Sequence, residues 1–398
     1  MDYLSLTKKF FSLLFLFLRI GCTAFGGPPA HLGFFRNEFV VEKKWLSEQK
    51  FADLVAICQF LPGPTTTQLA MIIGFSRLRY LGSLAAWIGF STPGSLALML
   101  IAISLKEGNG FITINQLYGL SIVAIVIVSH AVLMMAKQSC TDFPSLVIMT
   151  LSTGLLIHLT ETWMQLLVMI SSGLLGYIFI QSPARITNDL FPLEITKKSG
   201  FILITLFIGL LFGLSILAHM TQYHDLLLIN TFYRAGALVF GGGHAVIAFL
   251  NTTVVNYHWL DHQTFITGYA TVQAMPGPLF SFAGFLGASM NQAPNGFPGG
   301  IICLISIFLP GFLIAIGILP FWTVIKDHQA VRSSLAGIHA SVVGMLAATL
   351  YSHFYLNSVH GLIDLFWIIV TTIALLYLKI KPWMLVIISM ILSLLLLR

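Results

Sequence analysis

Long, predominantly apolar segments recur from one end of this chain to the other, and they restrict the fold more than any other feature. Clear examples are residues 201–217, 301–318, 366–378 and 384–397. Only 9% of the 398 residues are charged, whereas a soluble domain carries about 25% charged residues. A soluble fold of this size could not cover its surface with so few charges. We therefore expect an all-α, multi-pass membrane protein.

Several other classes of protein are disfavoured. The four cysteines lie in or beside apolar segments and lack the spacing of a metal or redox site. The net charge of +6 comes from Lys and Arg scattered at the ends of apolar segments, so it does not indicate a nucleic-acid partner. The sequence contains no pattern for nucleotide binding, nucleophilic hydrolysis or metal binding. We expect no enzyme activity, no metal and no cofactor.

An internal repeat divides the chain into two copies. Segments of the first copy return in the same order in the second: residues 17–21 as 232–236, 25–27 as 240–242, 45–51 as 259–265, 62–64 as 276–278, and 93–94 as 310–311. The polar, Pro-containing stretch between the copies is typical of a connecting loop. We predict a first repeat over residues 1–185, a loop over 186–198 and a second repeat over 199–398. The apolar segment after Lys8 resembles a signal peptide, but the repeat includes it, so we expect it to be retained.

The two copies differ in charge. The first copy carries Arg36, Lys43, Lys44 and Lys50 before its Pro-Gly-Pro motif and Arg77 and Arg79 after it, whereas the matching stretches 251–263 and 288–300 of the second copy contain no Lys or Arg. The positive-inside rule then places the two copies in opposite orientations, as in many secondary transporters. We expect roughly ten to fourteen membrane helices of about 20 residues each.

The same charges predict a re-entrant hairpin. Both basic groups of the first copy belong on the cytoplasmic side, although the apolar segment 51–75 lies between them. That segment should therefore enter the membrane and return. A simple crossing by residues 10–35 would place Lys8 and Lys9 outside, so the first apolar segment is also expected to be broken or re-entrant.

The repeated Pro-Gly-Pro motif is the strongest candidate for a substrate site. Pro lacks an amide hydrogen and Gly is flexible, so the motifs should interrupt helices, and interrupted helices in both halves of a transporter mark a midplane site. The next residues would begin a new half-helix, whose free amides and hydroxyls suit an anion. A kink needed only for packing is the alternative. The candidate residues are Pro62, Gly63, Pro64, Thr65, Thr66, Thr67, Gln68, Pro276, Gly277, Pro278 and Ser281.

A pair of glycines in each copy predicts a second set of helix breaks. Gly26 and Gly27 in the first copy match Gly241 and Gly242 in the second. Their amides could face a ligand in an unwound turn, or the glycines could serve close helix packing.

Two arginines occupy equivalent positions inside apolar segments. Arg19 and Arg234 could together neutralise a doubly charged oxyanion, or each could reach the membrane interface. His31, Glu38 and His244 follow the glycine pairs and are candidates for proton coupling. For Glu38 the alternative is a solvated position among neighbouring basic residues.

At these motifs the chain resembles the chromate ion transporter family in its long, two-domain form. The resemblance rests on Phe-Gly-Gly-Pro at residue 25, Gln-Phe-Leu-Pro-Gly-Pro at 59, Phe-Gly-Gly-Gly-His at 240, Gln-Ala-Met-Pro-Gly-Pro-Leu-Phe at 273 and Ala-Pro-Asn-Gly-Phe at 293. It implies an inner-membrane protein that exports chromate with the proton motive force and confers resistance, and it carries over the glycine and Pro-Gly-Pro residues. The chain departs from the family pattern at Asn37 and Thr253, where relatives often carry an acid.

We therefore expect a secondary transporter that moves chromate out of the cell, with protons as coupling partner and lipid around a monomer or homodimer. Export is electrically favourable, because a dianion leaving an inside-negative cell gains roughly 4–5 kcal/mol per 100 mV. The residues themselves indicate an oxyanion rather than chromate, since sulfate has the same shape and charge. A proton-coupled importer of sulfate or another oxyanion and an anion channel are the alternatives, and a scaffold for partner proteins is a third.

Overall fold

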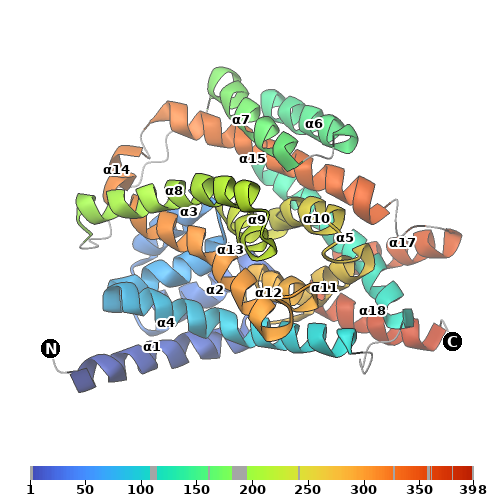
Figure 1. The fold of residues 1–398 in the computed structure, drawn as a ribbon, viewed down its shortest axis with the longest axis horizontal. Coiled ribbons are helices and arrows are strands. Elements are labelled where there is room, and N and C mark those ends of the chain that lie inside the picture. The colour runs from blue at the N-terminus through green and yellow to red at the C-terminus, as the bar shows by residue number, and fades with distance from the viewer. Residues whose placement is uncertain are drawn as a thin grey trace.

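The structure, a computed structural model, describes residues 3–107, 114–159, 162–181, 195–240, 243–325, 328–355, 359, 361–378 and 380–396. Over these residues the elements are helices joined by loops, with no strand among them (Figure 1). In the described part of the chain, five helices are long and apolar enough to cross a membrane: Thr65–Lys106, Ile122–Ser139, Lys197–Thr221, Gly296–Phe321 and Gln329–Ser352. Six shorter apolar helices accompany them. The expected all-α, multi-pass membrane fold is confirmed.

The first copy of the repeat forms eight elements. They are α1 (Tyr3–Thr23), α2 (Gly27–Arg36), the π-helix η1 (Asn37–Glu42), α3 (Glu48–Phe60), α4 (Thr65–Lys106), α5 (Ile114–Ser139), α6 (Phe143–His158) and α7 (Thr162–Phe179). The first apolar segment is broken, as the charges of Lys8 and Lys9 predicted, because α1 ends at Thr23 and α2 begins at Gly27.

In the described residues the second copy is divided into more pieces. Its elements are α8 (Lys197–Thr221), α9 (His224–Leu238), η2 (Gly243–Ala245), α10 (Val246–Asn256), α11 (His262–Ala274), η3 (Leu279–Ser281), α12 (Phe282–Ser289), α13 (Gly296–Ile318), η4 (Leu319–Phe321), α14 (Trp322–Ile325), α15 (Gln329–Thr349), the π-helix η5 (Leu350–Tyr355), α17 (Leu362–Leu376) and α18 (Pro382–Leu396). Here α8 precedes α9, the helix that matches α1. Equivalent helices begin in the same way: the Ser47 side chain caps α3, and the Asp261 side chain caps α11.

Each copy contains a tight helical hairpin after its Pro-Gly-Pro motif. In the first copy, α4 reverses direction at Leu78 and Arg79, whose backbone angles are not helical. The two arms of α4 then lie side by side, and the Ser83 hydroxyl donates a hydrogen bond to the Met71 carbonyl at 2.7 Å. In the second copy, α12 and α13 form the corresponding hairpin, with Gly287 in close contact with the Gly299 carbonyl.

The two copies exchange helices instead of packing as separate bundles. Helix α15 of the second copy packs against α6 and α7 of the first (Figure 1), while α5 of the first copy packs against α17 and α18 of the second. Small residues permit the close approach, since Gly176 of α7 touches Gly337 of α15. Each copy therefore depends on the other for its packing.

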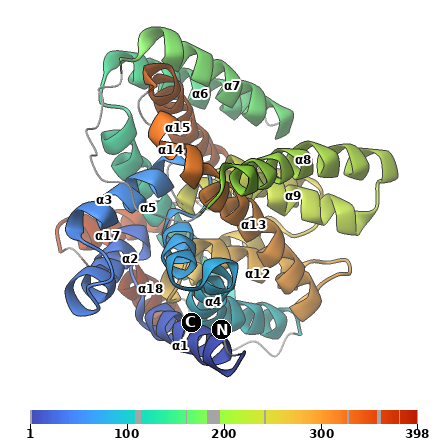
Figure 2. The same ribbon diagram turned by 90° about the vertical axis from the view of Figure 1, so that its left-hand side faces the viewer.

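The outer helices present apolar side chains outward. Phe143 of α6, Ile170 of α7 and Phe201 of α8 are all more than 60% exposed, and α8 and α9 project together from the body (Figure 2). Such a large apolar exterior suits contact with lipid chains rather than water.

Candidate functional site

The first Pro-Gly-Pro loop, between α3 and α4, is held by the second half of the chain. The Gly63 amide donates a hydrogen bond of 2.7 Å to the carbonyl of Val239, the residue two positions before the second glycine pair. Gly63 has φ 114°, a left-handed conformation that favours glycine. The ring of Pro64 rests against Gly311 of α13. The interruption of the helix expected at this motif is present.

The second Pro-Gly-Pro loop, between α11 and η3, repeats this arrangement with the halves exchanged. The Gly277 amide donates a 3.0 Å hydrogen bond to the carbonyl of Ala24, two positions before the first glycine pair. Gly277 has φ 101°. The Pro276 carbonyl lies against Gly94 of α4, which is the counterpart of Gly311. Each loop is thus seated on the matching element of the other repeat.

Both loops contact interior turns of a long apolar helix. Gly94 lies about 21 Å from Tyr80, where the second arm of α4 begins, and about 18 Å from Lys106, where that arm ends, at 1.5 Å per residue. Gly311 lies about 22 Å from the start of α13 and about 10 Å from its end at Ile318 by the same rise. A bilayer that these helices cross would enclose both loops, and unpaired backbone in hydrocarbon needs a protein or water partner.

Side chains at the starts of the two half-helices contact the same helix, α13. The aromatic ring of Phe280, in η3, lies 6.0 Å from the ring of Phe308 on α13. The Gln68 side-chain amide, in the first turn of α4, approaches the carbonyl of Gly311 at 3.4 Å. Phe308 and Gly311 are about 4.5 Å apart along the axis of α13. Both half-helix starts therefore pack against one stretch of α13, and we call this region the junction.

Polar side chains without a partner among the described residues follow each break. Thr67 and Ser281 are 0% and 1% exposed, and neither hydroxyl has a hydrogen-bond partner among the described residues. The Gln68 amide nitrogen bonds the Pro62 carbonyl at 2.7 Å, whereas its Oε1 has no partner there. No side chain caps the start of α4, so the first amides of that helix are available. A buried polar group without a partner is costly, so these side chains stay candidates for binding a ligand.

One face of α4 adds groups that sequence reasoning missed. Trp87, Ser91 and Ser95 follow one another at helical spacing beside Gly94. The Trp87 Nε1 and both serine hydroxyls are buried without a partner among the described residues. Trp87 also contacts Phe308 at a ring distance of 6.0 Å. The repeat of Pro93-Gly94 as Pro310-Gly311 is the sequence signal that could have pointed to this face.

Arg19 forms an ion pair. Its guanidinium lies 2.5 Å from a carboxylate oxygen of Glu38, and the Lys43 ammonium lies 3.6 Å from the other oxygen. The Glu38 side chain is 9% exposed, whereas that of Arg19 is 62% exposed. Glu38 also belongs to the π-helix η1, a form that is frequent at functional sites. Two of the candidate residues, far apart in sequence, are thus brought into one cluster.

Arg234 differs from its counterpart. It is half-buried on α9, and it forms no hydrogen bond or ion pair within the described residues. The ring of His31 is 1% exposed and bonds the Ala24 carbonyl at 3.0 Å, next to the second Pro-Gly-Pro loop. His244 bonds the Tyr269 hydroxyl at 2.8 Å.

The glycine pairs are placed only in part. Gly26 and Gly27 both have positive φ and join α1 to α2, which makes this segment an unwound turn. Gly241 and Gly242 lie outside the described residues. The roles of all these residues in binding stay predictions.

The basic residues of the first copy gather around Trp45. The Arg77 guanidinium lies 4.1 Å from the centre of the Trp45 ring, and the Lys43 ammonium lies 5.6 Å from it. Arg36 hydrogen-bonds Glu48, which raises the pKa of the Arg36 guanidinium. Segment 51–75 therefore leaves this end of the molecule and returns to it. In the second copy, the Asn291 amide donates to the Trp259 carbonyl at 3.0 Å, so that hairpin also closes on itself.

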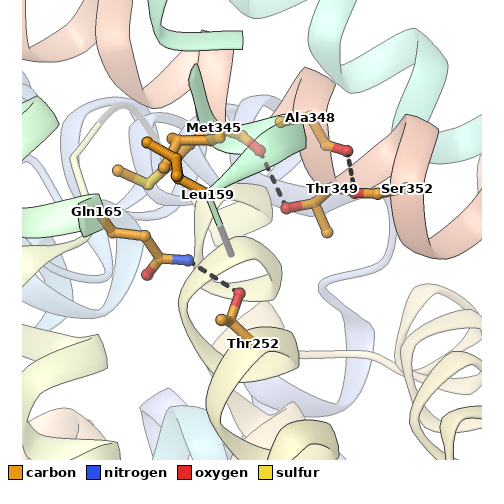
Figure 3. A pocket seen from close by; sticks show the side chains of 8 residues that line it. Leu159, Gln165, Thr252, Met345, Ala348, Thr349 and Ser352 are labelled. Carbon is orange, nitrogen blue, oxygen red and sulfur yellow. Dashed lines mark hydrogen bonds between the residues drawn. The ribbon is translucent and has the colours of Figure 1, made fainter. Parts of the chain in front are cut away.

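A separate polar pocket lies between α7, α10 and α15 (Figure 3). Its lining residues are Leu156, Leu159, Gln165, Thr252, Met345, Ala348, Thr349 and Ser352. None of the residues predicted from sequence is among them.

Comparison with known proteins gives a consistent result across most of the chain. The sequence model of the chromate transporter family matches residues 11–177 and 226–394, one stretch in each half of the chain. An uncharacterized transporter of Methanocaldococcus jannaschii is 29% identical over 385 residues, covering 96% of this chain and 93% of the relative. The chromate transport protein of Cupriavidus metallidurans is 26% identical over 340 residues, which cover 84% of this chain and 80% of the relative. The chromate transport protein of Pseudomonas aeruginosa is 26% identical over 341 residues, which cover 84% of this chain and 78% of the relative. No solved structure matches the chain.

Proposed function

We propose, from the premise that this chain belongs to the chromate transporter family, that it exports chromate across the cell inner membrane by proton-coupled antiport and confers chromate resistance. Family membership supports chromate transport itself. The direction of transport and its coupling to protons are the proposal. Export agrees with the membrane potential, because a departing dianion gains roughly 4–5 kcal/mol per 100 mV.

The observation that carries the proposal is the junction of the two broken helices. Half-helix starts from both repeats contact α13, and each carries a buried hydroxyl, of Thr67 or Ser281, without a partner among the described residues. Hydroxyls and free amides at a helix start are donors, and the helix dipole there attracts negative charge. This combination favours a tetrahedral oxyanion near the middle of the membrane.

An inverted arrangement of the two repeats is the second part of the proposal. The basic cluster around Trp45 includes Arg77, which directly precedes the turn into the second arm of α4. Lys106, at the far end of that arm, bonds the Met290 carbonyl at 2.7 Å. That arm is about 40 Å long, which exceeds the thickness of the hydrocarbon core. The turn of the second hairpin, beside Trp259, is therefore far from the turn of the first. Two hairpins that open to opposite sides support alternating access.

Proton coupling is proposed to act through Glu38. The Glu38 carboxylate and an anion would compete for the Arg19 guanidinium. Proton transfer at Glu38 would therefore change the affinity of this cluster for chromate. His31 and His244 remain further candidates for the proton path.

The test is chromate uptake into inverted membrane vesicles that contain the protein. We expect saturable uptake that increases when the vesicle interior is made acidic, and that falls at least about tenfold in the Arg19→Ala/Arg234→Ala double variant, because a charge-assisted hydrogen bond contributes about 1.5–3 kcal/mol. Full uptake in the double variant would remove the arginines from the mechanism. Competition by sulfate with inward flux in right-side-out vesicles would instead support an oxyanion importer, and current without saturation would support a channel.

A further inference from the structure

We propose that His31 is a positioning residue for transport: its imidazole holds the second Pro-Gly-Pro loop in place, as the Gln68 amide holds the first. The proposal rests on the proposed chromate transport, but on neither its direction nor its coupling to protons. Its basis is one backbone carbonyl, that of Ala24, which accepts hydrogen bonds from both the His31 ring and the Gly277 amide, each at 3.0 Å.

The second Pro-Gly-Pro loop rests on residues of the first repeat, which we call its seat. The Gly277 amide bonds the Ala24 carbonyl, and a Cβ on Gly277 would lie 3.3 Å from the carbonyl oxygen of Phe90. The carbonyl of the loop's first proline lies against Gly94. His31 contacts two residues of this seat, because its ring donates to Ala24 and lies perpendicular to the ring of Phe90, at a centroid distance of 5.5 Å. The His31 side chain is therefore part of the support under the loop.

The bond from His31 to Ala24 acts on the backbone at the first glycine pair. Ala24 follows the end of α1 and precedes the unwound turn of Gly26 and Gly27, whereas His31 lies beyond that turn on α2. A carbonyl only accepts hydrogen bonds, so the Nε2 of His31 carries the hydrogen, and two lone pairs allow the Ala24 oxygen to accept both donors. The ring thus closes the turn and fixes the carbonyl to which Gly277 is bonded.

The first Pro-Gly-Pro loop has a side-chain donor from a different source. The Gln68 amide, in the first turn of α4, donates to the Pro62 carbonyl at 2.7 Å. In the second copy the register of the Pro-Gly-Pro motifs places Phe282 at the position of Gln68, and a phenyl ring cannot donate. The register of the glycine pairs places Val246 at the position of His31. Each loop is therefore supplied with a buried side-chain donor, and the first repeat provides both.

This arrangement predicts that the two loops can be loosened separately. Without the His31 donor, the Ala24 carbonyl would keep the Gly277 amide, but the glycine turn that carries the carbonyl would lose the bond that closes it. The second loop should then open locally more often, whereas the first loop, held by Gln68, should not. Exchange of backbone amide hydrogens reports such local opening, so both loops can be compared within one protein.

The experiment measures hydrogen–deuterium exchange at the amides of Gly277 and Gly63 in the purified full-length protein without chromate. The side chain of Asn is too short to bring its amide to the Nε2 position of His31, whereas the amide nitrogen of Gln lies close to it. We expect exchange at Gly277 to be about two- to tenfold faster in His31→Asn, the change that corresponds to the loss of one neutral hydrogen bond. The matched control His31→Gln should exchange like the wild type, and Gly63 should be unchanged in both variants.

Chromate flux into inverted vesicles is the second readout. His31→Asn should lower the flux by a similar factor, about two- to tenfold, because a loop that leaves its seat more often holds its half-helix start in place for less of the time. His31→Gln should restore the flux, since it restores the donor. Thermal unfolding reports whether each variant folds. If His31→Asn does not fold, His31→Phe takes its place, because it removes the donor and keeps an aromatic ring against Phe90.

Several results would overturn the proposal. Unchanged exchange at Gly277 in His31→Asn would mean that the ring does not hold the loop, and equal acceleration at Gly63 would mean that His31 only supports the fold in general. Equal effects of His31→Asn and His31→Gln would exclude the donated hydrogen bond as the cause. Faster exchange with full chromate flux would show that transport does not need this seat. A wild-type protein without chromate flux would instead contradict the proposed function, and exchange alone would then decide whether His31 holds the loop.

Discussion

The two Pro-Gly-Pro loops share one backbone design, whereas the arginines of the two repeats have different surroundings. Gly63 and Gly277 both adopt positive φ, and each donates its amide to the residue that precedes the other repeat's glycine motif. Arg19 lies against Glu38 and is largely exposed, while Arg234 is half-buried and has no ion pair among the described residues. The backbone frame is therefore symmetric, and the charges on it are not.

This difference separates two tasks. A symmetric frame of broken helices brings both half-helix starts to α13, and it needs both repeats equally. The charged side chains decide where an anion or a proton is held. Among the described residues, a carboxylate is paired with the arginine of the first repeat, Arg19, and not with Arg234 of the second. Substitutions at the Pro-Gly-Pro loops and their glycine contacts should thus affect both repeats, whereas substitutions of Arg19 and Arg234 should lower chromate flux to different extents.

The largest effect is expected from filling the contact between Gly94 and the second loop. A Cβ on Gly94 would lie 2.2 Å from the Pro276 carbonyl oxygen, and a Cβ on Gly311 would lie 2.9 Å from the Pro64 ring. We expect Gly94→Ala to abolish chromate flux and to destabilise the protein by about 3 kcal/mol or more, with a smaller loss for Gly311→Ala, because the overlap is less severe. Thermal unfolding in detergent and vesicle flux measure both.

Gly209→Ala is the control for this pair, because a Cβ there meets no atom within 4 Å. It should leave unfolding and flux unchanged. Equal and small effects at Gly94 and Gly311 would show that the loops are not seated on these helices as described.

The next largest effect should distinguish the roles of Arg19 and Arg234 in anion binding. Arg234→Ala should lower chromate flux about 100-fold, because Arg234 has no ion pair of its own and can offer an anion two charge-assisted hydrogen bonds, each contributing about 1.5–3 kcal/mol. Arg19→Ala should lower flux less, since Glu38 already occupies its guanidinium. Initial rates over a range of chromate concentrations give the comparison.

Arg234→Lys and Arg19→Lys serve as controls that keep the charge and lose the fork geometry. A greater loss of flux in Arg19→Ala than in Arg234→Ala would reverse the assignment of the main anion-binding arginine.

The smallest effect is expected at the two unpartnered hydroxyls of the junction. Thr67→Val and Ser281→Ala should each raise the KM for chromate by about tenfold, because one hydrogen bond to a charged group contributes about 1.5–3 kcal/mol. Stability should hold, since neither hydroxyl bonds a described residue. Ser306→Ala, whose hydroxyl donates to the Ile302 carbonyl at 2.7 Å, is the control. A KM that does not change in both variants would argue against the junction as the anion site.

Much of this architecture could be predicted from local sequence. Proline and glycine restrict the backbone wherever they occur, so the breaks at Pro62 and Pro276 were visible without a structure. The first hairpin followed from Arg36 and Arg77, because basic residues on both sides of an apolar segment place its ends on one side of the membrane. The structure agrees, since Arg77 lies on Trp45.

The side-chain contacts between separate elements could not be predicted in this way. Arg19 meets Glu38, and Gln165 meets Thr252, through contacts between elements that local patterns do not relate. The exchange of α5 and α15 between the repeats is of the same kind. In lipid the apolar faces of helices are chemically alike, so small residues and shape choose the partners.

The sequence by itself thus determined a helical membrane protein built from two copies of a broken-helix unit, because composition, glycine, proline and charge act on each segment separately. Only the tertiary structure decided that each loop rests on the other repeat, that Glu38 pairs with Arg19, and that a polar pocket lies between α7, α10 and α15. Those outcomes depend on which helices lie side by side, and that depends on the packing of the whole chain.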